Sequence, residues 1–310
     1  MDELVHVPVM PQEVIRYLAP PEGGLVIDAT LGEGGHSALF LDASPRIHLV
    51  GLDADATMLE RAAWRLAPYS QRCTLRHIWF DDYFSSYREP ERPMAVLFDL
   101  GISMYHFRQS GRGFALREQE RLDMRLNPSS QTTAETIVNT CGEQEIADLI
   151  FRFGEERYSR RIAAEIVKRR RQAPIETAAE LAAIVAGCVP PGYRYGRIHP
   201  ATRTFQALRI AVNSELDRLQ RALDAAIDVL ADGGRLGVIS FHSLEDRIVK
   251  HTFRQRRNRS MAEARTPMSS SEQVQIITRK PLIAEPQECR ANPASRSAKF
   301  RVIAKGKGVS

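Results

Sequence analysis

The residues best placed to bind a ligand lie in segment 26–37, an apolar run that ends in a glycine-rich turn. The turn contains Gly32, Gly34, Gly35 and His36. Because glycine has no side chain, the backbone amides of such a turn can approach a cofactor closely. A second apolar run ends at Asp53, about 20 residues after the first glycine, where a carboxylate can accept hydrogen bonds from both ribose hydroxyls. This spacing predicts a site for an adenosine-containing ligand.

The residues of the turn favour one class of adenosine ligand. A dinucleotide site needs a third glycine for helix packing and a helix N-terminus that holds a pyrophosphate. In this turn Gly35, His36 and Ser37 occupy the region of the third glycine without matching its spacing, and the turn contains Glu33, which would repel a pyrophosphate. S-adenosylmethionine carries a sulfonium and an ammonium group and no phosphate, so a turn with Asp28 and Glu33 is better suited to it. The alternative is a tight turn in an unrelated α/β protein.

Composition excludes several classes of protein. The chain has 310 residues, of which 43% are hydrophobic and 26% charged, as in ordinary globular proteins. No apolar run is long enough to cross a bilayer, and the acidic start lacks the basic region of a secretory signal, so we expect a cytoplasmic protein without membrane contact. The four cysteines are far apart, which argues against a zinc site or a disulfide framework. No metal site is predicted.

Charge is unevenly distributed along the chain. Residues 1–107 carry 8 Lys and Arg against 15 Asp and Glu, whereas residues 108–209 carry 17 against 12. Residues 210–246 are acidic again, with 3 against 7, and residues 247–310 carry 15 against 4. An acidic cofactor region beside basic segments is typical of an enzyme that modifies a polyanion. The alternative for the last segment is a solvated basic tail.

The order of apolar runs predicts an α/β fold. Short strand-like runs alternate with helical patterns up to residue 99, then return at 234–240 and 299–304. Between residues 108 and 209 the chain has helical patterns and no convincing strand. We therefore predict a Rossmann-like sheet formed by residues 1–107 and 210–310, with an inserted all-helical domain at 108–209 that recognises the substrate. Residues 255–275 have few apolar positions and predict a loop.

A basic helix is expected at residues 157–171. Its apolar stripe is formed by Ile162, Ile166 and Val167, and its other faces present Arg160, Arg161, Lys168 and Arg171. Such a cluster can follow a row of phosphates. The alternative is an ordinary solvated helix surface.

Several segments in the same order resemble the RsmH (MraW) family of bacterial ribosomal RNA methyltransferases. The matching segments are His6 with 8–10, then 28–37, 99–103, 111–114, 122–125, 158–161, 199–209, 213–215, 240–247 and 292–297. The resemblance implies a class I methyltransferase sheet and N4-methylation of a decoding-centre cytidine, number 1402 in standard rRNA numbering, of 16S rRNA in the small ribosomal subunit. The implied cofactor is S-adenosyl-L-methionine and the implied partner is 16S rRNA. Both a monomer and a homodimer stay open.

The resemblance also assigns residues to the cofactor. The implied contacts are Gly34, Gly35, His36, Asp53, Phe80, Asp99 and His106. The family usually has Gln where this chain has His106, and a neutral imidazole replaces only one of the two hydrogen bonds of an amide. Phe80 has an alternative as an ordinary core aromatic.

Asp99 is the leading candidate for catalysis. The N4 amine of cytosine is a poor nucleophile because its lone pair is delocalised into the ring, and a hydrogen-bond acceptor on the amine would localise that pair. Asp99 is expected at the end of a central strand, although it could serve the cofactor alone. Phe241 and His242 follow another strand, where the aromatic ring can stack on a cytosine and the histidine is either a base or a structural residue.

Two other classes of function compete with this hypothesis. A methyltransferase for DNA adenine or protein glutamine would usually carry Asn or Asp followed by Pro-Pro and an aromatic residue, which 99–102 lacks. An RNA-binding module with a vestigial cofactor fold would not bind S-adenosylmethionine, so cofactor binding would discriminate it.

Overall fold

A computed structural model describes residues 7–116, 119–196, 198–263 and 273–306. His6, one of the residues that carry the resemblance, lies outside these ranges. The chain divides into two compact units. The sheet unit comprises Met1–Ile102 and Leu216–Ser310, and the helical unit comprises Ser103–Glu215. The helical unit extends a few residues beyond the predicted 108–209 at each end.

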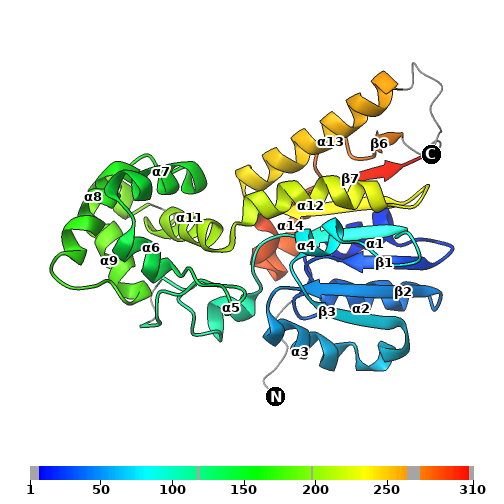
Figure 1. Ribbon diagram of the computed structural model, residues 1–310, viewed down its shortest axis with the longest axis horizontal. Coiled ribbons are helices and arrows are strands. Elements are labelled where there is room, and N and C mark those ends of the chain that lie inside the picture. The colour runs from blue at the N-terminus through cyan, green and yellow to red at the C-terminus, as the bar shows by residue number, and fades with distance from the viewer. Residues whose placement is uncertain (1–6, 117–118, 197, 264–272, 307–310) are drawn as a thin grey trace. The chain divides into compact units, whose positions relative to one another are not determined.

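The sheet unit is built on seven strands (Figure 1). They are β1 (Gly24–Asp28), β2 (Ile47–Asp53), β3 (Cys73–His77), β4 (Ala95–Asp99), β5 (Arg235–Ser240), β6 (Val274–Ile276) and β7 (Lys299–Lys305). Their order is β3-β2-β1-β4-β5-β7-β6, with β1 to β5 parallel and β7 antiparallel to both neighbours. The predicted α/β class and Rossmann-like sheet are confirmed. The strand order reverses direction between β1 and β4, and such a switch point opens a crevice at the carboxyl ends of the strands.

Helices cover both faces of this sheet because the parallel strands are apolar on both sides. One face packs against α1 (Pro11–Leu18), α2 (Gly35–Ala43) and α3 (Ala56–Arg65). The other face packs against α4 (Phe80–Ser85), α12 (Glu215–Val229) and α13 (Ser243–Glu263). Strand residues alternate accordingly, so that Val26 faces the first group while Leu25 and Ile27 face the second. A short helix, α14 (Pro286–Ala291), precedes β7.

The predicted loop at 255–275 is wrong at both ends, since Val274 and Gln275 belong to β6. Helix α13 continues to Glu263, and residues 264–272 lie outside the described ranges. The helix is held against α12 by contacts that the local sequence does not show. Gln220 Nε2 donates to Thr252 Oγ1 over 3.2 Å, and Arg256 forms an ion pair with Asp228.

The helical unit has helices of four to twelve residues. They are α5 (Met104–Arg108), α6 (Ala134–Thr140), α7 (Glu143–Gly154), α8 (Ser159–Arg170), α9 (Ala178–Cys188), α10 (Pro191–Arg194) and α11 (Thr202–Asn213). In its described residues, β pairing is limited to one isolated bridge between Arg121 and Thr177. Across the described ranges of the whole chain, no helix is both long enough and apolar enough to cross a membrane.

The long segment before α6 is held by side-chain hydrogen bonds. Arg125 donates to both carboxylate oxygens of Asp123 over 2.7 Å. Met124 lies in the left-handed region with φ 61°, and its carbonyl accepts from Asn213 Nδ2 at 2.8 Å. Asn213 Oδ1 in turn accepts from the amide of Leu126. Two of the segments behind the family resemblance, 122–125 and 213–215, therefore build structure in this unit.

This arrangement predicts an acid-sensitive contribution to stability. Partial burial would raise the pKa of Asp123, but the hydrogen bonds from Arg125 outweigh it and lower the pKa below its ordinary 3.8. A lowered pKa in the folded chain means that the carboxylate stabilises the fold at neutral pH, and that this contribution is lost as the pH falls below 3.8. We expect Asp123→Asn to lower the free energy of unfolding at pH 7 by about 1.5–3 kcal/mol. Urea unfolding should show a smaller difference from wild type at pH 3, and an equal difference at both pH values would contradict the assignment.

Candidate functional site

The glycine turn leads from β1 directly into α2. Gly34 has φ 76°, which favours glycine, and its amide donates to the carbonyl of Leu31 at 2.8 Å. The turn lies close to α3, since an added Cβ at Gly35 would be 2.9 Å from Nη1 of Arg65. Glu33 is fully buried, and its carboxylate accepts a 2.6 Å hydrogen bond from Arg61 Nε. Glu33 thus anchors the turn to α3, and its interpretation as a charge facing the ligand is wrong.

A buried carboxyl group, Asp28, lies at the end of β1. Its Oδ2 accepts from the hydroxyl of Ser37 at 2.7 Å, and its Oδ1 accepts from the amide of Thr30 at 3.3 Å. Burial raises the pKa of Asp28, and nearby His36 and these hydrogen bonds oppose the rise. Asp28 therefore fixes the start of α2 relative to β1.

Asp99 lies at the end of β4, next to the end of β1 where Asp28 lies. Thr30 contacts its backbone amide and His36 faces its carboxylate. The amide of Asp99 donates to Thr30 Oγ1 at 2.6 Å, and His36 Nε2 is 3.4 Å from Asp99 Oδ2. The side chains of His36 and Asp99 are only 4% and 10% exposed. Asp99 Oδ1 and both ring nitrogens of His36 are buried without a hydrogen-bond partner. Buried polar atoms are normally paired, so these three atoms are candidates for contact with a bound molecule.

Asp53 ends β2 on the other side of β1. Its two carboxylate oxygens accept from the amides of Gly32 and Asp55, each at 2.8 Å. These bonds orient the carboxylate, and each oxygen has a second lone pair. Asp53 thus also connects the glycine turn to the neighbouring strand.

Phe80 begins α4, and its ring is half-buried at the edge of the core. The ring packs edge-on against Phe98 with centroids 5.5 Å apart and against Trp79 at 6.5 Å. Trp79 is covered by the guanidinium of Arg218 at 4.2 Å. Phe80 therefore combines a core contact with a partly exposed ring.

The end of β5 places Phe241 next to the end of β4. Gly101 has φ 104°, and an added Cβ there would be 3.5 Å from the ring of Phe241. His242 is held by Glu245: its Nε2 is 3.1 Å from Oε1, and its Nδ1 accepts from the Glu245 amide at 3.4 Å. Glu245 also accepts from the amides of Phe241 and His242. Nδ1 of His242 is thus occupied by the Glu245 amide, whereas Nε2 is buried without a hydrogen-bond partner among the described residues, so the structural role and the general base both stay predictions.

His106 belongs to α5 in the helical unit. Its ring is buried and packs edge-on against Phe114 at 5.4 Å and Tyr105 at 6.0 Å. Its contact with a cofactor stays a prediction.

The residues of the sheet unit fit a cationic adenosine ligand. A glycine-rich turn, a carboxylate oriented at the end of β2 and an unpaired carboxylate oxygen at the end of β4 lie around the switch point of the sheet. His36, Asp99 and the supporting Thr30 lie together, as the rule for strand ends predicts. The hydrogen bonds of Asp28 with Ser37 and of Asp99 with Thr30 were not predicted. Both Thr30 and Ser37 lie beside the glycine turn in the sequence, which is the signal that could have indicated them.

Known protein sequences match this chain over almost its whole length. A sequence model described as the MraW methylase family matches residues 3–306. The ribosomal RNA small subunit methyltransferase H of Treponema denticola is 47% identical over 306 residues, which cover 97% of each chain. The protein of that name from Synechococcus elongatus is 47% identical over 297 residues, covering 96% of this chain and 93% of the relative. Among solved structures, an rRNA methylase from Streptococcus thermophilus is 11% identical with a TM-score of 0.42, over 96% of this chain and 94% of that chain.

Proposed function

The chain belongs to the MraW methylase family and is a methyltransferase whose methyl donor is S-adenosylmethionine, and from this premise we propose that it methylates 16S rRNA. Two relatives of 47% identity are named for the small ribosomal subunit and its RNA. The specific reaction we propose is N4-methylation of cytidine 1402 in standard rRNA numbering. Small ribosomal subunits occur in the cytoplasm, where we place the protein.

We assign the methyl donor to the crevice at the carboxyl ends of β1, β2 and β4. The glycines at 34 and 35 admit it to the turn, Asp53 accepts from the ribose hydroxyls, and Phe80 packs against the adenine. His36 and Asp99 complete the crevice with their unpaired polar atoms. His106 of the helical unit is the further contact that we carry over from the family resemblance.

Asp99 is the residue that we assign to catalysis. S-adenosylmethionine supplies an electrophilic methyl group when it is bound. Asp99 Oδ1 accepts a hydrogen bond from the N4 amine, which localises the nitrogen lone pair and holds the nitrogen in line for attack. The N–C bond would form as the methyl–sulfur bond of the donor breaks and S-adenosylhomocysteine leaves, and the N4 proton that is lost would pass to the same oxygen and then to solvent.

The neighbours of Asp99 keep that oxygen available. His36 faces Oδ2 of the carboxylate and the Thr30 hydroxyl accepts from the backbone amide of Asp99, while Oδ1 is unpaired. The Phe241 ring lies next to Gly101 at the adjacent strand end, where it can stack on a cytosine turned out of its helix. The unpaired, buried Oδ1 of Asp99 is the observation that carries the proposal.

The substrate assignment has a direct test. Wild-type protein should transfer labelled methyl groups from S-adenosylmethionine to small subunits that lack the modification, and nuclease digestion with mass spectrometry should find N4-methylcytidine at position 1402. Naked 16S rRNA should be a poorer substrate. Label on adenine, on protein, or on another cytidine would contradict the proposal.

The helical unit is our candidate for substrate recognition. Arg160, Arg161 and Lys168 on α8 and Arg171 directly after it are exposed, while Ile162, Ile166 and Val167 form the buried stripe of the helix. Arg170 differs from these, since it donates to the carbonyl of Val138 and supports the fold. Our proposal requires only one copy of the chain, and the homodimer is left to a measurement of mass in solution.

A further inference from the structure

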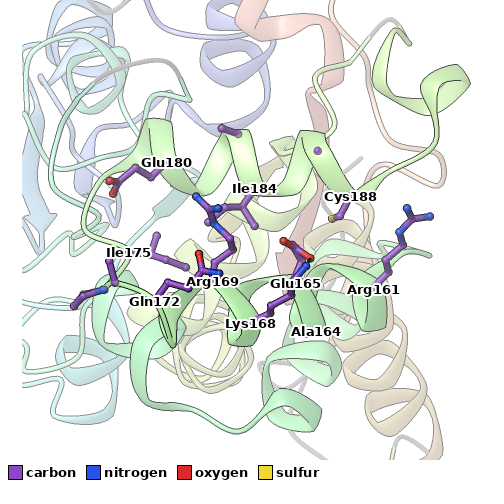
Figure 2. Close-up of a pocket in the computed structure, with 14 residues that line it drawn as sticks. Arg161, Ala164, Glu165, Lys168, Arg169, Gln172, Ile175, Glu180, Ile184 and Cys188 are labelled. Atoms are coloured by element: carbon purple, nitrogen blue, oxygen red, sulfur yellow. Dashed lines mark hydrogen bonds and ion pairs between the residues drawn. The ribbon is translucent and has the colours of Figure 1, made fainter.

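A groove of about 710 Å³ lies between α8 and α9 in the helical unit (Figure 2). Its α8 wall carries Arg161, Lys168 and Arg169. Its α9 wall carries the small or short residues Ala183, Ile184 and Gly187. The groove contains none of the residues assigned to methyl transfer.

The groove has a small net positive charge, because its lining contains Arg161, Lys168 and Arg169 against Glu165 and Glu180. Glu165 forms an ion pair with Lys168 at 3.5 Å. Glu180 Oε2 accepts from the amides of residues 176 and 177 at the start of α9, and these backbone hydrogen bonds lower the pKa of Glu180. Arg161 and Arg169 are both exposed, and the charge of Arg169 contributes to the lowered pKa of Glu180 across the groove. Figure 2 shows Arg169 reaching from α8 towards α9 and Arg161 at the end near Cys188.

Flat π surfaces lie at that same end of the groove. Arg194 of α10 donates to the Gly187 carbonyl at 3.0 Å, which holds α10 against the end of α9. The neighbouring Tyr193 ring lies 5.1 Å from the ring of Tyr158. The guanidinium of Arg157 lies over both rings, at 4.8 Å from Tyr158 and 5.1 Å from Tyr193. The Tyr193 hydroxyl also donates to the buried Glu156, so this cluster is fixed in place.

We propose that the groove between α8 and α9 binds the sugar-phosphate backbone of a single-stranded segment of the rRNA. The cluster of Arg157, Tyr158 and Tyr193, the Arg157 cluster, stacks on a base of the same segment. This inference rests on the proposed function. Arginine and lysine along one wall match phosphates, and aromatic rings with an arginine match bases. The alternative polyanionic occupant of this groove is an acidic amphipathic helix of a protein, which would need a deep apolar groove for its apolar face. The α9 wall offers little more than Ala183, Gly187 and the half-buried Ile184.

A pair of charge-matched double variants tests this proposal. Arg161→Gln with Arg169→Gln removes two charges from the groove, whereas Arg46→Gln with Arg152→Gln removes two exposed charges that do not line it. We expect the first variant to raise the KM for small subunits roughly tenfold and to reduce the salt slope of RNA binding by about two. Its kcat and its affinity for S-adenosylmethionine should stay at wild-type values. The second variant should stay within about twofold of wild type.

A third variant fills the groove without changing its charge. Gly187 lies in α9, and an added Cβ there meets no atom within 4 Å, so Gly187→Leu can fold and places a side chain in the groove. We expect it to raise the KM for small subunits as well. Leucine also favours a helix over glycine, which works against unfolding as an explanation.

Binding of a labelled single-stranded RNA of the decoding-centre sequence separates this inference from the proposed function. If wild type binds this RNA and the groove variants do not, the groove assignment holds even where methyl transfer to small subunits fails. Equal losses in both double variants would overturn it in favour of a general charge effect. Unchanged RNA binding together with weaker binding to small subunits would overturn it in favour of a protein occupant.

Discussion

Asp99→Asn should lower the rate of methyl transfer to small subunits by roughly 10²- to 10⁴-fold, because the amide keeps the shape of the carboxylate but takes up no proton. The hydrogen bond from the Asp99 amide to Thr30 does not depend on the side chain and should persist. Single-turnover rates at saturating S-adenosylmethionine measure the effect, and calorimetry measures cofactor affinity beside it.

The same variant separates catalysis from cofactor binding. If Asp99 only binds the cofactor, the dissociation constant for S-adenosylmethionine will rise, and a high cofactor concentration will restore the rate. If the proposal is correct, the rate stays low at every cofactor concentration. A rate restored to wild type would remove Asp99 from the catalytic role.

Asp53→Ala should weaken S-adenosylmethionine binding by roughly 10- to 100-fold. Hydrogen bonds to a charged group contribute about 1.5–3 kcal/mol, and each 1.4 kcal/mol corresponds to a factor of ten in affinity. Calorimetric titration measures the dissociation constant. The maximal rate at saturating cofactor should change little, because Asp53 lies on β2 and touches no reacting atom.

A matched variant controls for the second role of this carboxylate. Asp53 also accepts from the amides of Gly32 and Asp55, so its removal loosens the turn. Asp53→Asn keeps one acceptor oxygen and the size of the side chain, and we expect a smaller loss of affinity than with Ala. Wild-type affinity in the Ala variant would contradict the ribose assignment.

The strands and the site residues that end them could be predicted because the signal is local. Runs such as 25–28 and 47–52 are apolar and bounded by turn residues, and the carboxyl ends of parallel strands meet at one edge. That rule is enough to bring Asp53, Asp99 and the glycine turn together. The turn favoured S-adenosylmethionine over a dinucleotide but left an unrelated α/β protein as the alternative, and the resemblance supplied the reaction.

Other features depend on contacts between distant residues. Glu33 reads as a free charge in the sequence, but Arg61 lies 28 positions away and pairs with it in the folded chain. The continuation of α13 depends on α12, as the contact between Gln220 and Thr252 illustrates. The role of Arg170 is similar, since only the fold brings it to the carbonyl of Val138. The groove between α8 and α9 is likewise a product of packing.

A crystal structure with S-adenosylhomocysteine and cytidine tests the central claim most directly. We predict that the N4 nitrogen lies within about 3.2 Å of Asp99 Oδ1, with His36 still facing Oδ2. A cytidine whose amine points away from Asp99, or a homocysteine moiety outside the crevice at β1 and β4, would contradict the account.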